Sequence, residues 1–148
     1  MTIADTDVLI DFLSASEPAA GHVRAELRNG NLATTVITRF ELLSGARSTR
    51  VTRAIGELLE SIRTLELNST AADRAAAVRR SLERKGSTIG MGDSLIAGIV
   101  LVLRLMGSDS LVVEHATSIS DRETPVDFKF DAIHPAVPGT GALAEFRK

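Results

Sequence analysis

Residues 3–13 read IADTDVLIDFL, a short apolar segment that runs into Asp5 and then into apolar residues at helical spacing. The segment before Asp5 predicts a buried strand, and Asp7 lies where the N-cap of a following helix is expected. A carboxylate at the end of a buried strand either belongs to the start of a helix or is a ligand in a metal site. The stretch therefore predicts a strand-to-helix junction that carries spare negative charge.

The same alternation continues along the chain. Further strands are predicted at residues 32–38 (LATTVIT), 64–67 (TLEL) and 109–114 (DSLVVE), which are short and apolar. Helices are predicted over residues 17–30, 38–48, 51–63, 70–85 and 93–106, where apolar residues recur at helical spacing. Strands that alternate with helices favour a parallel sheet in an α/β fold.

Three of the predicted helices begin with recognisable signals. The pairs Thr38 with Glu41 and Thr70 with Asp73 have the spacing of a capping box. Asp93 follows a glycine-bearing loop, STIGMG, and lies where an N-cap is expected. The helix after it is apolar on nearly all sides, which predicts that it is buried.

Composition limits the classes of function. The 148 residues fit one domain, and 44% hydrophobic with 24% charged residues is ordinary for a globular protein. The absence of cysteine excludes disulfides and thiolate zinc sites. A net charge of −2 and an aromatic content of 3% argue against a base-stacking platform for nucleic acid. No secretory signal is recognised, and the longest apolar run is too short to cross a bilayer, so a cytoplasmic location is expected.

The composition changes after Glu114, and three of the four prolines lie beyond it. We expect one domain over residues 1–130, with an edge strand at residues 126–130 (VDFKF). Residues 131–148 are predicted to form a loosely ordered C-terminal tail.

Three carboxylates follow or adjoin predicted strands. Asp5 ends the first strand, Glu41 lies early in the helix after the second, and Asp93 begins the apolar helix. Functional groups gather at the carboxyl ends of parallel strands, so the three can converge on one edge of the sheet. Carboxylate oxygens suit Mg²⁺ or Mn²⁺. Each residue also has a structural interpretation, Glu41 as the capping-box glutamate and Asp93 as an N-cap.

The segments IADTDVLIDFL, TTVITRFELLSGA and IGMGDSLIAGIVL resemble, in order and spacing, the motifs of PIN-domain ribonucleases, and most closely those of VapC toxins. The resemblance covers about residues 3–105. It implies a PIN-like three-layer sandwich, with a central, mainly parallel sheet flanked by helices.

The resemblance also implies an activity, a Mg²⁺- or Mn²⁺-dependent endoribonuclease that is the toxin of a toxin–antitoxin module. Asp5, Glu41 and Asp93 fall on the family's catalytic and metal-binding acids, and Thr6 falls on the hydroxyl position beside the first acid. The implied chemistry is in-line attack of a metal-activated water on an RNA phosphodiester. The implied partners are the RNA substrate, a small VapB-like antitoxin and a second copy of the chain.

The chain departs from the family after the predicted strand that ends in SLVV. The family continues with Thr, a variable residue and Asn or Asp, whereas this chain reads VVEHATSISDRE. His115 stands where a polar fourth ligand is expected, so that ligand is Glu114, Asp121 or none. The departure favours either an impaired site or a tail that is read in an altered frame.

Two other functions compete with the nuclease. The segment DTDVL resembles the opening motif of haloacid-dehalogenase-like phosphatases, with Asp5 as nucleophile and Asp7 as acid and base. That interpretation finds no convincing lysine and gives Glu41 no role. The second alternative is a catalytically impaired PIN-like module that binds RNA or an antitoxin without cutting RNA.

Two kinds of surface are expected beside the acids. Arg39, Arg47, Arg50 and Arg53 form either a solvated helix face or a set of RNA phosphate contacts. Apolar residues near Leu13, Leu42 and Leu59 that the core does not use would suit a dimer or antitoxin surface.

Overall fold

The fold is an α/β sandwich in which helices cover both faces of a small parallel sheet. A computed structural model describes residues 1–107 and the backbone of residues 112–114. In chain order the elements are β1 (Thr2–Ala4), α1 (Thr6–Leu13), α2 (Ala19–Arg28), β2 (Leu32–Thr35), α3 (Val36–Gly45), α4 (Thr49–Ser61), β3 (Arg63–Leu65), α5 (Ser69–Arg84), α6 (Met91–Leu105) and β4 (Val112–Glu114). The predicted α/β class is confirmed.

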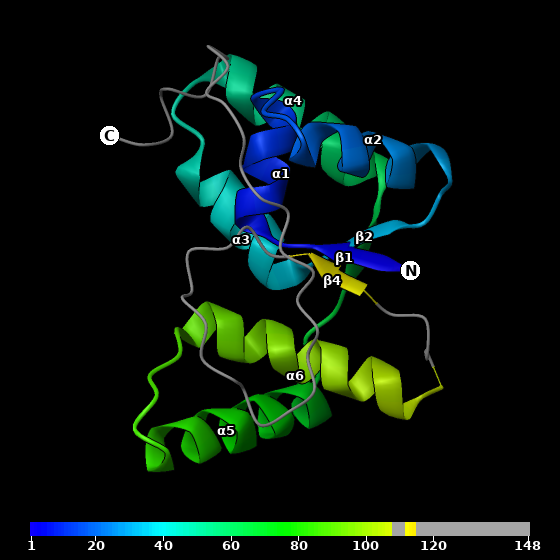
Figure 1. The fold of residues 1–148 in the computed structure, drawn as a ribbon. Coiled ribbons are helices and arrows are strands. Elements are labelled where there is room, and N and C mark those ends of the chain that lie inside the picture. The colour runs from blue at the N-terminus through cyan, green and yellow to red at the C-terminus, as the bar shows by residue number, and fades with distance from the viewer. Residues whose placement is uncertain (108–111, 115–148) are drawn as a thin grey trace.

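The four described strands lie in the order β3-β2-β1-β4, and all neighbouring pairs are parallel. In Figure 1, α1, α2 and α4 lie on one side of the sheet, and α6 with α5 lies on the other. The strands begin on the side marked N, so their carboxyl ends lie on the side of α3. This arrangement gives the three layers expected from the sequence.

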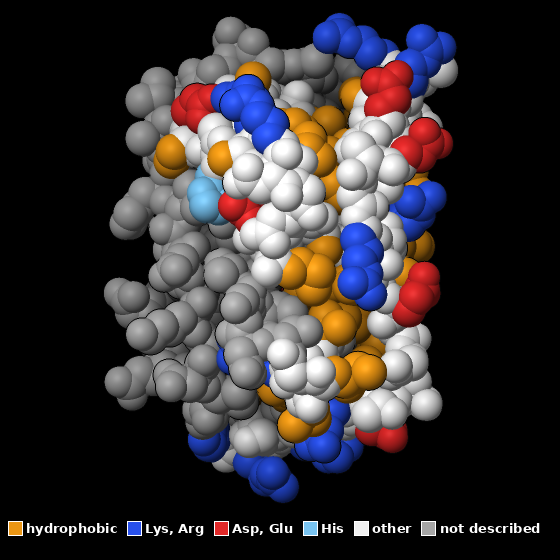
Figure 2. Space-filling model, turned by 90° about the vertical axis from the view of Figure 1, so that its right-hand side faces the viewer, with side chains coloured by type: hydrophobic (Ala, Val, Ile, Leu, Met, Phe, Trp, Pro, Cys, Tyr) orange, Lys and Arg blue, Asp and Glu red, His pale blue; other side chains and the backbone are white. Residues whose placement is uncertain are grey.

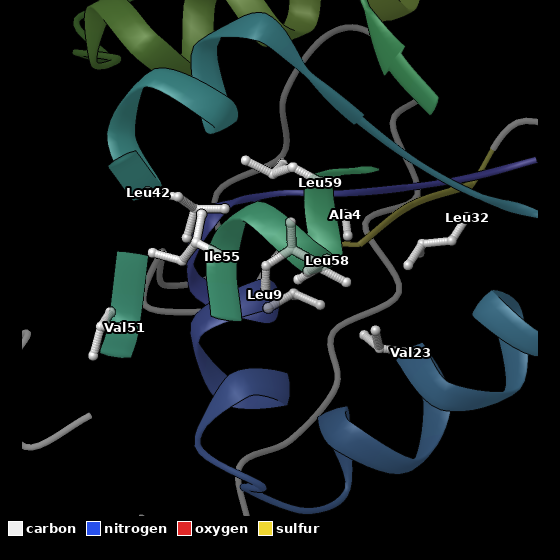
Figure 3. Close-up of a cluster of buried hydrophobic side chains, with 10 residues drawn as sticks. Ala4, Leu9, Val23, Leu32, Leu42, Val51, Ile55, Leu58 and Leu59 are labelled. Carbon is white, nitrogen blue, oxygen red and sulfur yellow. The ribbon is translucent and has the colours of Figure 1, made fainter. Parts of the chain in front are cut away.

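The core is divided between the two faces of the sheet. Successive residues of a strand point to opposite faces, so Ala4 and Leu32 join one buried cluster while Ile3 and Ala33 join the other. The larger cluster is completed by side chains from α1 to α4, namely Val8, Leu9, Val23, Leu42, Val51, Ile55, Leu58 and Leu59. Figure 3 shows this cluster and labels all of these residues except Val8. A sheet covered on both faces suits parallel strands.

The expectation that Leu42 and Leu59 lie on a free apolar surface is wrong. Both side chains are buried, because the faces of α3 and α4 that carry them pack on the sheet. Leu13 is half-buried against the same cluster. The exposed apolar residues of α3 are instead Phe40 and Leu43.

Three helix starts differ from the sequence prediction. Asp5, not Asp7, caps α1, because Asp5 has the extended backbone that a cap needs whereas Asp7 lies inside the first turn. Thr35, not Thr38, caps α3, so β2 ends earlier than predicted. Asn68 caps α5 in place of Thr70. In each case the cap is the last residue before the helix, and its side chain accepts a hydrogen bond from a backbone N–H group of the first turn.

The apolar helix α6 is buried along one face rather than all round. Gly98, Ile99 and Val100 are buried, whereas Leu105 and Met106 are well exposed at its C-terminal end. Figure 2 shows the side of the molecule on which the strands begin, where apolar side chains are exposed between charged ones. No helix in the described ranges is long and apolar enough to cross a membrane.

The end of the chain is only partly described. The predicted strand at residues 109–114 is confirmed by β4, which pairs with β1. The predicted edge strand at residues 126–130, the boundary of the domain at residue 130 and the tail over residues 131–148 lie outside the described residues.

Candidate active site

The site is best followed from Asp5, which comes directly after β1 at the carboxyl edge of the sheet. Its carboxylate is buried, and Oδ1 accepts a hydrogen bond of 3.0 Å from the backbone N–H of Val8. The predicted ligand is therefore also the N-cap of α1. A carboxylate has two oxygens, each of which can accept more than one bond, so a cap can also be a ligand.

Glu41 lies in the second turn of α3, which follows β2. Because Thr35 caps this helix, Glu41 is too far from the cap to be its capping-box glutamate. Its half-buried carboxylate instead accepts a hydrogen bond at Oε2 from the hydroxyl of Thr6. The structural interpretation of Glu41 is thus wrong, and its carboxylate points toward the residue beside Asp5.

Asp93 is the third residue of α6, so it is not the N-cap that the sequence favoured. The cap position is taken by Gly90, which offers no side chain. A Cβ atom built on Gly90 would lie 2.8 Å from Oδ2 of Asp93, so this carboxylate folds back over the first turn. A Cβ atom on Gly92 would lie 2.7 Å from Oε1 of Glu41. Glu41 therefore reaches the same turn from α3.

These contacts connect the three predicted acids through their chain neighbours. Asp5 adjoins Thr6, which bonds Glu41, and Glu41 lies against Gly92, which adjoins Asp93. Within the part of the chain that the structure describes, no three side chains among His, Cys, Asp and Glu approach closely enough to hold a metal ion together. Carboxylates repel one another, and here two of them have hydrogen-bond partners of their own.

The residues at this edge fit a hard divalent cation by their chemistry. The three acids offer only oxygen donors, which Mg²⁺ and Mn²⁺ prefer. Near α6, the carboxylate of Asp93 lies where a side chain at Gly90 would be, and that of Glu41 lies where a side chain at Gly92 would be. The first turn of α6 and the cap of α1 face the same edge, and helix N-termini favour negative charge there.

The strand β4 brings one further acid toward the site. It pairs in parallel with β1, and the register sets Glu114 opposite Ala4, the residue before Asp5. The backbone thus brings Glu114 to the edge where a fourth ligand was expected, although its side chain is not described. The other candidate, Asp121, lies outside the described residues, as does His115.

Several residues of this edge escaped the sequence analysis. Thr34 is fully buried and its hydroxyl donates a hydrogen bond of 2.9 Å to the carbonyl oxygen of Ala4, which joins the ends of β1 and β2. Gly90 and Gly92 were assigned to a loop, yet their positions adjoin both carboxylates. The available signal was the pair of glycines that precede Asp93 within three residues, at the start of a predicted helix.

The predicted basic residues lie on the surface. Arg39 is exposed on α3, Arg47 follows that helix, and Arg50 and Arg53 are exposed on α4. Within the described ranges none of the four forms an ion pair with a carboxylate. Their charges are therefore available to a phosphate.

Comparisons with known proteins identify the family of the chain. The model of the PIN domain matches residues 2–106. Ribonuclease VapC10 of Mycobacterium tuberculosis is 35% identical over 97 residues, which covers 66% of this chain and 72% of that protein. The tRNA(fMet)-specific endonuclease VapC of Shigella flexneri is 29% identical over 98 residues, covering 64% and 74%.

Solved structures share the fold at lower identity. The VapBC2 complex of Rickettsia felis, bound to a DNA fragment from its promoter, superposes with a TM-score of 0.64 at 16% identity, over 78% of this chain and 87% of that one. A toxin–antitoxin complex from Klebsiella pneumoniae gives a TM-score of 0.62 at 19% identity, over 79% and 87%. At these identities the likeness concerns the fold.

Proposed function

Since the chain belongs to the PIN-domain family, we propose that it is a divalent-cation-dependent endoribonuclease and the toxin of a toxin–antitoxin pair. The observation that carries the proposal is the series of contacts from Thr6 through Glu41 to Gly92, which links the neighbours of three acids far apart in sequence. Two similar proteins are named as a ribonuclease and a tRNA-specific endonuclease. The match to the PIN domain gives no support to the phosphatase alternative.

Asp5, Glu41 and Asp93 would hold the cation, Mg²⁺ or Mn²⁺. A divalent cation at these oxygens would lower the pKa of water and offset the charge that develops on the phosphate during cleavage. Thr6 would orient Glu41 through its hydrogen bond. The carboxylate of Asp5 is fixed relative to β1, because it is buried and accepts the cap hydrogen bond from Val8.

The RNA strand would be held by cations at the rim of the site. Phosphates and the three carboxylates repel each other, so positive charge beside the acids is needed to bring them together. Arg39, Arg47, Arg50 and Arg53 would supply it. All four are exposed: Arg39 lies on α3 two residues before Glu41, and the other three lie between the end of α3 and the first turns of α4. Cellular RNA as substrate is consistent with a cytoplasmic location.

The partner would be a small antitoxin, by analogy with the complexes whose fold this chain shares. Phe40 and Met91 are each 69% exposed, and Leu43 is 40% exposed. These apolar side chains lie on α3 and at the start of α6, close to the proposed site. A protein that covered them would bury apolar area and block the access of RNA.

The test uses the full chain, purified free of any partner. Structured RNA and a phosphomonoester are each incubated with Mg²⁺, with Mn²⁺ and with a chelator. RNA cleavage that needs the cation and disappears in Asp5→Asn supports the proposal. Turnover of the phosphomonoester alone would favour a phosphatase. A folded chain that binds RNA or an antitoxin but cuts nothing with either cation would favour the impaired module.

A further inference from the structure

Gly90 and Gly92 begin α6, and carboxylates lie where their side chains would be. A Cβ atom on Gly92 would be 2.7 Å from Oε1 of Glu41 and 3.7 Å from Cγ2 of Ile37. A Cβ atom on Gly90 would be 2.8 Å from Oδ2 of Asp93. Real Cβ atoms essentially never approach another heavy atom this closely. The present positions of both carboxylates therefore depend on having glycine, which has no Cβ atom, at positions 90 and 92.

The backbone does not require glycine at either position. Gly90 has φ −58° and ψ 155°, which other residues adopt freely. In the described part of the chain, the glycines with positive φ are Gly30, Gly86 and Gly107. Conformational freedom thus explains those three glycines but neither of the two at the start of α6.

Local helix stability also disfavours glycine at position 92, whereas glycine is an accepted N-cap residue at position 90. α1, α3, α4 and α5 are each capped by a side chain, from Asp5, Thr35, Ser48 and Asn68. Gly90 makes no such bond. Inside the first turn, alanine would be a better helix former than Gly92. A glycine that weakens the first turn of a helix, where a carboxylate fills the space of its side chain, is expected to have a functional reason.

We propose that Gly90 and Gly92 are positioning residues, which set the carboxylates of Asp93 and Glu41 against the first turn of α6 so that both can hold one divalent cation. The proposal deepens the nuclease function and rests on it. The turn offers N–H groups and the positive end of a helix dipole, which favour negative charge. Larger residues would push one carboxylate away and weaken cation binding.

The experiment measures Mn²⁺ affinity directly, from the electron paramagnetic resonance signal of free Mn²⁺ over the full chain without a partner. Gly92→Ala and Gly90→Ala are compared with Gly56→Ala, a control inside α4 where a Cβ atom meets nothing within 4 Å. We expect the first two to lose about 10- to 100-fold in affinity, as for changes beside metal ligands. The control should stay within about twofold of wild type.

Thermal unfolding separates positioning from a loss of structure. Because alanine favours helix over glycine, Gly92→Ala should unfold at the wild-type temperature or above it while its Mn²⁺ affinity falls. Affinity losses that follow a drop in the unfolding temperature in both variants would overturn the inference.

A compensating variant tests the contact itself. Glu41→Asp shortens the side chain by one methylene, which gives room to a Cβ atom at position 92. If the two positions interact, Glu41→Asp should cost less Mn²⁺ affinity in Gly92→Ala than in wild type. Strict additivity of the two losses would count against the proposed contact.

Outcomes for the inference and for the nuclease proposal are distinct. If wild-type protein binds Mn²⁺ more tightly than the two glycine variants but leaves RNA intact, the positioning role is supported and the nuclease proposal is contradicted. If wild-type protein cuts RNA, and Gly90→Ala and Gly92→Ala bind Mn²⁺ as tightly as wild type, only the positioning role is contradicted. Wild-type protein with no affinity for Mn²⁺ overturns the positioning role.

Discussion

The hydroxyl of Thr6 donates a hydrogen bond to Oε2 of Glu41, which joins the first residue of α1 to the second turn of α3 across 35 positions of sequence. The bond fixes a half-buried carboxylate that otherwise has several rotamers available. The same hydrogen bond also directs the carboxylate of Glu41 toward the end of the sheet at which Asp5 lies. The bond therefore offers a direct way to test whether the orientation of Glu41 matters.

Replacing Thr6 by valine keeps the shape of the side chain and removes the donor. We expect Thr6→Val to lower the rate of RNA cleavage about 10- to 100-fold at limiting Mg²⁺, since the carboxylate loses its orienting partner. Thr6→Ser should restore most of the rate. Thr52→Val, at an exposed threonine of α4, is the control. Equal rates for Thr6→Val and wild type over a range of Mg²⁺ concentrations would contradict the role.

Asp5 is expected to act both in the helix cap and in the site, and two variants separate these roles. Asparagine caps helices about as well as aspartate, so Asp5→Asn should keep the free energy of unfolding within about 0.5 kcal/mol of wild type. Asp5→Ala also loses the bond to Val8 and should be less stable by about 0.5–2 kcal/mol.

Both Asp5 variants should lose more than about 100-fold in RNA cleavage, because each removes the charge that would bind the cation. Urea unfolding and cleavage assays on the same preparations provide the comparison. An active Asp5→Asn protein would show that this carboxylate serves the fold alone.

The stability of the α5–α6 pair should depend on Gly98. A Cβ atom there would lie 2.2 Å from the carbonyl oxygen of Ala71 and 2.9 Å from Cβ of Ala75, so the helices could not keep their present separation. We expect Gly98→Ala to destabilise the protein by about 1–3 kcal/mol. Gly56→Ala, in open space on α4, should be neutral or stabilising by up to about 1 kcal/mol. Similar urea midpoints for the two variants would refute the close packing.

Much of the fold could be predicted from local patterns. The apolar run before Asp5 and the alternation of strands with helices were sufficient for the parallel sheet, because burial on both faces leaves a strong hydrophobic signal. The exact helix starts were not predictable. Asp5 and Asp7 are equally good caps in sequence, and the sheet decides between them, since β1 ends at Ala4 and Thr34 bonds its carbonyl oxygen.

The three acids could be predicted, but their connections could not. Asp5, Glu41 and Asp93 were recognisable because each adjoins a predicted strand end or helix start. The contact of Glu41 with Gly92 depends on how α3 packs beside α6, and a single sequence contains no signal for such a distance. The same holds for Leu42 and Leu59, whose burial depends on which helix face meets the sheet.

Acid sensitivity should arise partly at Glu26, which contacts Thr2 at the start of β1, at the opposite end of the strands from the proposed site. Its carboxylate accepts hydrogen bonds from the Thr2 hydroxyl at 2.7 Å and from the Asn31 side chain at 2.6 Å. The bond from Thr2 is the main cause that holds the pKa of Glu26 below its usual 4.5, with Asn31 and His22 acting in the same direction against burial. The ionised form is therefore the one that the fold favours.

A lowered pKa in the folded state stabilises the protein above the unfolded-state pKa, and this contribution is lost as the pH falls through the folded-state value. Glu26→Gln should therefore be less stable than wild type at pH 7, by roughly 1 kcal/mol or less. The difference should shrink as the pH falls below 4.5 and then through the lower folded-state pKa, because Glu26 takes up its proton first in the unfolded chain and then in the folded one. Urea unfolding of both proteins between pH 3 and pH 7 provides the measurement, and a difference that stays constant over this range would mean that Glu26 contributes through its shape and not through its charge.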